Sequence, residues 1–208
     1  MTPMYSSARL AAGLAPLLLL ASVLSGPMQA GDDERDKRER RQREKIGDLE
    51  EKLAERHRYP KPSREQVYFH AQAAALLKNL KELRRDSYRF DRIARATDAL
   101  LEASQRIFEA RRQTKGKDEH DRREAALDLQ EDYFRVQQAD YFARQWGSRE
   151  AGNYVRHARS LYQQARRTYD KNELDKAERL GDAASYVVRA LENLAQAEIP
   201  VPEPPPLP

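Results

Sequence analysis

The sequence predicts an all-α protein, built as an antiparallel helical bundle or a short α-hairpin stack of about five helices. Apolar residues recur at intervals of three and four through most of the 208-residue chain, as they do on one face of a helix. No segment alternates apolar and polar residues over β-branched side chains, so a sheet is not expected. Connections between the helical segments are short, which makes successive helices antiparallel.

Residues 1–30 have the three zones of a secretory signal peptide. Arg9 precedes an apolar run at residues 10–24, and turn-forming residues lead from there to a small-residue cleavage site that ends at Ala30. A retained membrane anchor is the alternative, but the run is shorter than the roughly 20 residues that span a bilayer, and Pro16 interrupts it. We expect cleavage and a periplasmic or secreted protein. It is not expected to be a lipoprotein, because no cysteine is present for acylation.

The amino-acid composition also indicates the cellular compartment and the kinds of binding partner. A secreted eukaryotic domain of this size more often contains disulfides, so the absence of cysteine favours a bacterial periplasmic protein. The 38 Lys and Arg residues are nearly balanced by 34 Asp and Glu residues, which argues against a nucleic-acid binder. Arginine pairs recur, for example at residues 84–85 and 166–167, so an anionic envelope surface is retained as one kind of partner.

Residues 31–62 are predicted to form a charged arm. Acidic and basic residues interleave in it, as in a solvated helix with i,i+4 ion pairs or in a disordered segment, and both interpretations stay open. The arm ends at Pro60 and Pro62, because a residue before proline is displaced from the helical region. The residues that could form its apolar stripe are Ile46, Leu49, Leu53 and Ala54.

The five helices are expected within residues 63–198. The first begins at a capping-box pattern, Ser63 with Gln66, and runs to about Arg85. The second is centred on Phe90 to Ile107, and the third runs from about Asp118 to Gln145. Ser148 and Asn172 are the expected caps of the fourth and fifth helices.

Each expected helix carries one apolar stripe. The stripe of the first helix is Val67, Ala71, Ala74, Leu77, Leu80 and Leu83. The stripe of the second is Phe90, Ile93, Thr97, Leu100, Ser104 and Ile107. The stripe of the third is Ala126, Leu129, Tyr133, Val136, Ala139, Ala143 and Trp146. Those of the last two are Ala151, Tyr154, Ala158, Leu161, Ala165 and Thr168, and Ala177, Leu180, Ala184, Val187, Leu191 and Leu194.

Two segments of the domain resemble each other. Residues Phe90–Ala99 align with Leu174–Ala183, and the same register pairs Ala74 with Ala158. One explanation is a duplicated helical hairpin. The other is a chance alignment, since amphipathic helices rich in Ala, Arg and Asp match one another easily.

The last hairpin also resembles a tetratricopeptide-type unit. Ala165, Ala177 and Ala184 occupy the small-residue positions of that motif, and residues 169–173 resemble its hydrophilic turn. The sequence departs from the motif at Gly181, where a large apolar residue is expected, and no proline closes the unit. The resemblance implies a scaffold for protein–protein contacts rather than catalysis.

No catalytic residue, metal site or cofactor is predicted. The four histidines are scattered, and no Glu-x-x-His pair supplies a dinuclear metal site. The sequence contains neither a glycine-rich phosphate loop nor a serine in a Gly-x-Ser-x-Gly turn. The protein is therefore not expected to be an enzyme.

Aromatic residues concentrate in the third expected helix, where a Tyr-Phe pair occurs twice. Such a helix is either buried on two sides or exposes an aromatic groove for a partner. The candidate partner-binding residues are Tyr133, Phe134, Tyr141, Phe142, Trp146, Tyr154 and Tyr162.

The chain ends in a proline-rich tail at residues 199–208, an extended spacer or a docking segment. The whole pattern favours a non-catalytic periplasmic scaffold or adaptor that binds another envelope protein through its helical hairpins. The alternative is a periplasmic chaperone-like holdase with an exposed aromatic patch. The oligomeric state and the identity of the partner are left open by the sequence.

Overall fold

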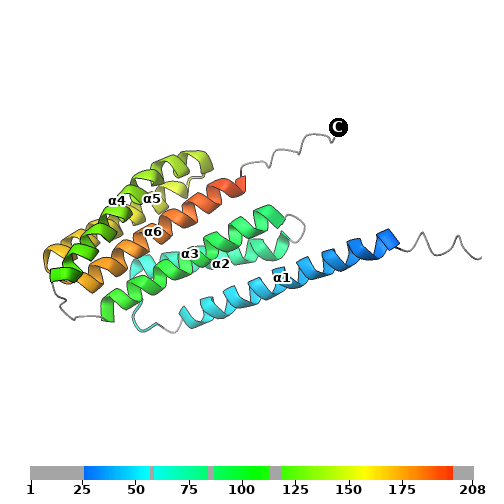
Figure 1. Ribbon diagram of the computed structural model, residues 1–208, viewed down its shortest axis with the longest axis horizontal. Helices are drawn as coiled ribbons and strands as arrows, with labels where there is room; N and C mark the ends of the chain where they lie inside the picture. Colours follow the sequence, from blue (N-terminus) through cyan, green and yellow to red (C-terminus); the bar gives the residue numbers. More distant parts are fainter. Residues whose placement is uncertain (1–25, 57–58, 84–86, 113–118, 199–208) are drawn as a thin grey trace, which may run out of the picture. The chain divides into compact units, whose positions relative to one another are not determined.

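The computed structural model describes residues 26–56, 59–83, 87–112 and 119–198, with only the backbone at residues 26–33, 87 and 119–121. These residues form six helices and no strand, so the all-α prediction is confirmed, with one helix more than expected (Figure 1). The helices are α1 (Gly26–Arg56), α2 (Arg64–Glu82), α3 (Ser87–Arg112), α4 (Glu119–Trp146), α5 (Ala151–Asp170) and α6 (Leu174–Glu198). Most of the predicted signal peptide and the whole proline-rich tail lie outside the described residues.

The chain divides into two units, Met1–Arg41 and Gln42–Pro208. The described part of the first unit is the N-terminal portion of α1, where most side chains are exposed. Ion pairs one turn apart run along it, Arg35 with Glu39 and Lys37 with Glu34, both at 3.5 Å. This part of the charged arm is therefore the solvated helix, and not the disordered segment, of the two interpretations.

The predicted boundary of the helical domain at residue 63 is wrong. The second unit begins at Gln42, because the C-terminal portion of α1 packs into its core. Leu49 is fully buried, and Ile46 and Leu53 are partly buried against the same core. Ala54, the fourth residue of the expected stripe, is exposed. Three apolar residues along one face were sufficient to attach a segment that is otherwise almost entirely charged.

The capping box of α2 is confirmed. The Gln66 backbone N–H donates to Ser63 Oγ at 3.2 Å, and the Ser63 N–H donates to Gln66 Oε1 at 2.9 Å. The predicted stripe of this helix is wrong in its first half, where Val67 is 54% exposed and Ala71 and Ala74 are exposed. It is confirmed in its second half, where Leu77 and Leu80 are buried. The residues that α2 buries are Gln66, Phe69, His70, Ala73, Leu77 and Leu80.

Two polar residues explain this error in α2. Gln66 is completely buried and its Nε2 donates to the backbone oxygen of Ser104 at 3.1 Å. His70 Nε2 lies 2.8 Å from Ser104 Oγ, in a second buried hydrogen bond. Because these buried hydrogen bonds offset the cost of desolvating Gln66 and His70, both residues lie on the inner face of α2, and Val67 lies on the outer face.

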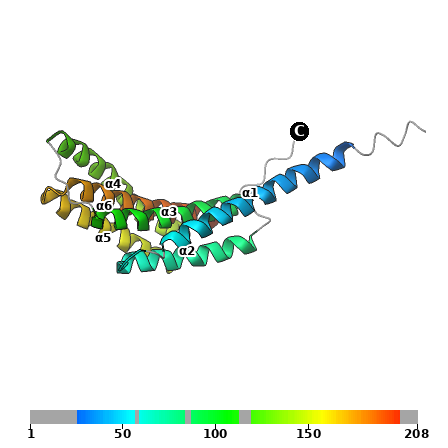
Figure 2. The same cartoon turned by 90° about the horizontal axis from the view of Figure 1, so that it is seen from below.

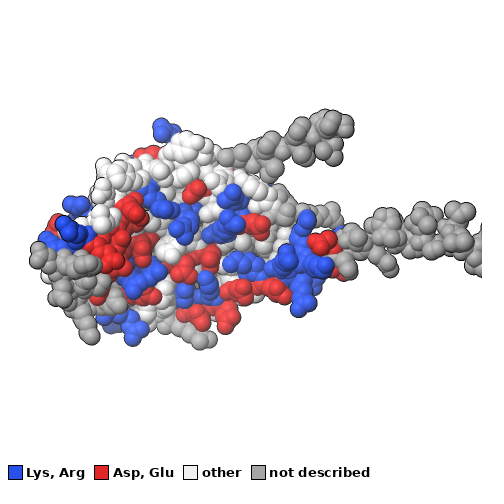
Figure 3. Space-filling view, viewed as in Figure 1, with Lys and Arg blue, Asp and Glu red and all other residues white. Residues whose placement is uncertain are grey.

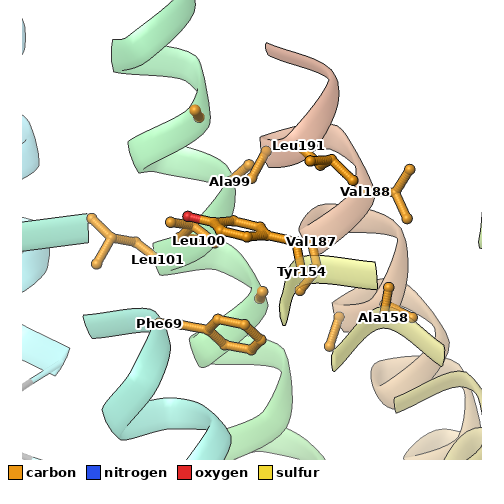
Figure 4. Close-up of a cluster of buried hydrophobic side chains, with 14 of the residues drawn as sticks. Phe69, Ala99, Leu100, Leu101, Tyr154, Ala158, Val187, Val188 and Leu191 are labelled. Atoms are coloured by element: carbon orange, nitrogen blue, oxygen red, sulfur yellow. The ribbon is translucent and has the colours of Figure 1, made fainter. Parts of the chain in front are cut away.

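α3 and α6 are antiparallel and lie side by side at the centre of the second unit (Figures 1 and 2). Two ion pairs show the antiparallel direction. Arg89 near the start of α3 pairs with Glu198 at the end of α6, at 3.0 Å, and Arg106 in the last part of α3 pairs with Asp182 in the first part of α6, at 3.4 Å. The predicted stripes of α3, α5 and α6 are all buried, which confirms them. Figure 4 shows the Tyr154 ring of α5 between these two central helices, close to Leu100 and Val187.

The hairpins α2–α3 and α5–α6 have equivalent places in the unit. Each second helix packs on its own first helix and on the other second helix. In the register that aligns Phe90 with Leu174, buried positions of α3 coincide with buried positions of α6. The coinciding pairs include Ile93 and Ala177, Ala96 and Leu180, Thr97 and Gly181, Ala99 and Ala183, Leu100 and Ala184, and Ile107 and Leu191.

α1 and α4 extend this equivalence to two three-helix halves. α1 contacts α2 through the ion pair of Glu50 with Lys81, and α3 through Lys52 with Asp98. α4 likewise contacts α5 and α6, although its backbone lies closer to them than that of α1 lies to α2 and α3. Aligning Ile46 with Leu129 also aligns Leu53 with Val136 and Leu49 with Asp132, all on the inner faces of their helices.

The contact between α4 and α6 depends on Gly181. A Cβ atom at this position would lie 2.1 Å from Asp132 Oδ2, which is too close for any real contact. Asp132 is only 8% exposed and accepts a hydrogen bond from the Ser185 hydroxyl. The glycine that departs from the tetratricopeptide pattern is thus the residue that admits a buried carboxylate.

Two of the expected caps are wrong. Ser148 does not cap α5, which begins at Ala151. Its Oγ instead accepts from the Glu150 N–H in the preceding turn, at 3.2 Å. Asn172 has a φ of 61° and forms the left-handed turn before α6, a conformation that asparagine tolerates better than most residues. No helix in the described residues is both long and apolar enough to cross a membrane.

Candidate functional site

α4 exposes a line of large apolar side chains on the face opposite the core. Its inner face carries Leu129 and Val136, both almost completely buried. On the outer face, Leu127, Phe134 and Tyr141 are 60%, 58% and 55% exposed. They follow at intervals of seven residues, almost two helical turns, so they form a single row along the helix.

The spaces in this row are filled by uncharged residues. The exposed glutamines Gln130, Gln137, Gln138 and Gln145 share the outer face with the row. Arginines occur there only toward the two ends, at Arg123 and Arg144, while carboxylates such as Glu131 lie at the margin. Charged residues make up 35% of the chain, so a long uncharged face is exceptional for it. In Figure 3 the surface over the upper end of α4 is mostly white, whereas other regions mix blue and red.

A groove adjoins the row where α4 meets α5. The rings of Tyr133 and Tyr162 are tilted against each other with centroids 5.8 Å apart. Together with Ala126, Gln130 and Arg166 they line a cavity of about 490 Å³. We call the row and this groove together the α4 face. It presents apolar and aromatic surface with a single guanidinium at one wall, a composition typical of sites that bind protein side chains.

Four of the predicted site residues lie on the α4 face, namely Tyr133, Phe134, Tyr141 and Tyr162. Phe142 and Trp146 are instead partly buried against the core, and the Trp146 indole meets the Tyr154 ring edge-on at 5.6 Å. The predicted aromatic set is therefore divided between the surface and the interior.

Tyr154 does not line an exposed groove, and that expectation is wrong. Its side chain is completely buried, and its hydroxyl has no hydrogen-bond partner among the described residues. Burial raises the pKa of this phenol, with smaller contributions from Tyr68 and Glu150. The Tyr68 hydroxyl bonds to Glu150 at 3.2 Å, and burial raises its pKa as well. Tyr154 is thus a core residue with a polar atom that the core does not satisfy.

Leu127 was missed by sequence reasoning, and it is the most exposed of the large apolar residues on α4. The expected stripe of this helix includes Ala126 and Tyr133, which are exposed, and it omits Leu127 and Phe134 next to them. A seven-residue spacing of Leu127, Phe134 and Tyr141 is nevertheless visible in the sequence. The inner face of α4 includes the polar residue Asp132, so a search for apolar residues alone does not identify that face.

Within the described side chains, no group of three or more His, Asp or Glu residues could hold a metal ion. The carboxyl with the clearest shift is that of Asp132, whose pKa burial raises to about 6. It faces the α6 backbone at Gly181 rather than a cavity, so its role is in packing.

Comparison with known proteins gave no relative: no family model, curated protein or solved structure matches the chain.

Proposed function

We propose that the chain is an exported, non-catalytic adaptor that binds another protein of the bacterial cell envelope through the α4 face. The exposed row of Leu127, Phe134 and Tyr141 is the observation that carries this proposal. Burying one such side chain stabilises a complex by about 1.5–3 kcal/mol before the costs of association. An uncharged row with a seven-residue period suits an amphipathic helix of the partner, which would align its own apolar residues along α4.

The signal-like composition of residues 1–30 supports the exported location. The corresponding measurement is the mass of the protein recovered from a periplasmic fraction after expression in a bacterium. Cleavage after Ala30 gives a chain that begins at Gly31. Recovery of the full-length chain with the membrane fraction would contradict the proposal of a soluble exported adaptor.

The binding proposal is tested by replacing Leu127, Phe134 and Tyr141 together with glutamine, the residue that already separates them. A matched control replaces Val67 and Tyr88, which are exposed apolar residues on α2 and α3, with the same residue. We expect the first variant to lose capture of a defined envelope protein and the control to retain it. Because all five side chains are exposed, both variants should keep the helical circular dichroism of the parent.

The holdase is the second candidate function. The closeness of Tyr133 and Phe134, with ring centroids 5.8 Å apart at the surface, favours contacts of broad specificity. A holdase suppresses aggregation of several unrelated unfolded proteins, whereas an adaptor binds one partner in a saturable manner. If the glutamine variant abolishes general suppression of aggregation and no single partner saturates, the holdase replaces the adaptor.

A further inference from the structure

A second cavity, of about 380 Å³, lies between α3 and α6, and none of its lining residues belongs to α4. Arg92 and Arg95 enter it from α3, and Arg189 and Asn193 from α6. Figure 3 shows several Lys and Arg side chains gathered where the right-hand halves of these two helices lie side by side. We refer to this cavity as the arginine cleft.

Carboxylates also line the arginine cleft, but they already have partners. Lys52 Nζ of α1 lies 2.7 Å from Asp98 Oδ1 and 3.1 Å from Glu102 Oε1. Glu192 accepts a hydrogen bond from Gln196 Nε2 at 3.2 Å. Arg56 Nη2 of α1 also lies 3.9 Å from Glu102 Oε1, so Lys52 and Arg56, both outside the lining, compensate two of the three negative charges. The three arginines then face a single remaining carboxylate, that of Glu192.

The three arginines make no ion pair within the described part of the chain. Arg92 Nη1 donates only a long hydrogen bond to Asn193 Oδ1, at 3.4 Å. The Arg189 guanidinium lies 5.0 Å from the Tyr186 ring centroid, a cation–π contact that leaves its N–H groups available. Arg95 has no carboxylate within 4 Å among the described residues. The cleft thus holds three guanidinium groups, none of which forms an ion pair with a carboxylate in the described part of the chain.

The equivalent place in the other half of the molecule is closed by ion pairs. The register that aligns Phe90 with Leu174 aligns Arg95 with Arg179 and Asn193 with Glu109. Arg179 Nη1 lies 3.3 Å from Glu109 Oε2, and Arg106 Nη1 lies 3.3 Å from the same oxygen. An amide therefore stands in the arginine cleft where the other half has the carboxylate that neutralises its arginines.

We propose that the arginine cleft is a binding site for a phosphate group, held by Arg92, Arg95 and Arg189. Guanidinium forks match phosphate oxygens in a bidentate manner, and three of them complement a dianion better than a single carboxylate. The cavity is large enough for a phosphate with a small attached group. This phosphate belongs either to a soluble phosphorylated molecule or to the headgroup of an anionic lipid.

Calorimetric titration of the purified chain with pyrophosphate, at low ionic strength, measures the binding of a soluble phosphorylated molecule. We expect saturable binding that weakens about tenfold or more in Arg95→Gln, since a hydrogen bond to a charged group is lost. Arg179→Gln, the matched change in the ion-paired half, should leave the affinity unchanged. Sedimentation with vesicles of phosphatidic acid in phosphatidylcholine measures the binding of an anionic lipid headgroup, with pure phosphatidylcholine vesicles as the control.

Asn193→Glu is the sharper variant because it removes no arginine. It places a carboxylate where the other half has Glu109, so Arg95 gains an internal partner and phosphate binding should be lost. Asn193 is buried, so Asn193→Glu can lower the melting temperature. In that case Arg95→Gln decides the test, because it changes an exposed side chain. The proposal is overturned if neither pyrophosphate nor phosphatidic acid vesicles bind, or if Arg179→Gln weakens binding as much as Arg95→Gln does.

Discussion

The two three-helix halves differ at the matched positions of α1 and α4. In the first half, the inner face of α1 carries Leu49, and the outer positions next to it are glutamates. In the second half, the matching inner position of α4 is Asp132, and the outer face carries Phe134. At these matched positions α1 thus has an apolar residue inside and charged residues outside, whereas α4 has a carboxylate inside and an aromatic residue outside. The contrast locates the departures from simple packing in the second half, where the α4 face lies.

A second contrast concerns the aromatic residues that fill the two hairpins. Phe69 of α2 and Tyr154 of α5 are both fully buried, one without a hydroxyl and one with an unpartnered hydroxyl. The second half therefore contains a buried carboxyl at Asp132 and a buried, unpartnered hydroxyl at Tyr154. Each can be tested by a substitution that makes the halves more alike.

The largest effect is expected from truncating these rings. Phe69→Ala and Tyr154→Ala should each lower the free energy of unfolding by about 3–5 kcal/mol, because each leaves a cavity in the core. Tyr154→Phe should instead keep or raise stability by about 1 kcal/mol, since it removes an unsatisfied hydroxyl. Urea denaturation followed by circular dichroism provides the values. A loss above 1 kcal/mol in Tyr154→Phe would show that the hydroxyl is satisfied in solution.

The next effect is a pH dependence caused by Asp132. Burial raises the pKa of this carboxyl from 3.8 to about 6, with Asp182 and Asp128 also raising it and Ser185 and Arg135 lowering it. The folded state therefore binds the proton more tightly than the unfolded state. The resulting stabilisation is present below pH 4 and is lost as the pH rises through about 6, an effect of about 3 kcal/mol.

Denaturation curves at pH 5 and pH 7.5 measure this dependence. The parent chain should be more stable at the lower pH, and Asp132→Asn should reduce the difference. Glu131→Gln, a change of the neighbouring exposed carboxylate, provides the matched control and should leave the difference as it is. Equal pH dependence in the parent and in Asp132→Asn would refute the assignment.

The smallest effect is expected at Gly181. Gly181→Ala should destabilise the protein by about 1–2 kcal/mol, because the new Cβ meets the Asp132 carboxylate and overpacks the crossing of α4 and α6. The gain in helix propensity offsets part of this cost. In the double variant with Asp132→Ala the clash disappears, so the two changes should couple by at least 0.5 kcal/mol in a double-mutant cycle. Additive effects would show that the helices separate without cost.

Much of this fold could be predicted from the sequence, for a physical reason. The inner faces of α3, α5 and α6 are apolar or small almost throughout, so the helical period identified them directly. The prediction of the inner face of α2 failed in part because Gln66 and His70 are buried against Ser104 of α3. A local sequence pattern cannot indicate a partner that is distant in sequence. α4 was identified only in part, because the buried Asp132 interrupts its inner stripe.

The candidate site was predicted in outline and not in detail. The repeated Tyr-Phe pairs indicated α4, but each pair spans about 100° of the helix, so adjacent aromatic residues face different surroundings. Tyr141 is exposed while Phe142 packs against the core. The arginine cleft had no sequence signal, since its residues come from α3 and α6 and depend on the antiparallel register of those helices.

The central position of α6 has a consequence for the order in which the molecule assembles. α6 packs on α3, α4 and α5, yet it is synthesised after the other five described helices. Until it emerges, the apolar residues of α3 and α5 that face it lack this part of their packing. Native packing is therefore completed late, and a chain that stops before Leu174 would keep its helical propensity but lack the contacts that join its two halves. We expect such a truncated chain to be more sensitive to proteolysis than the full chain.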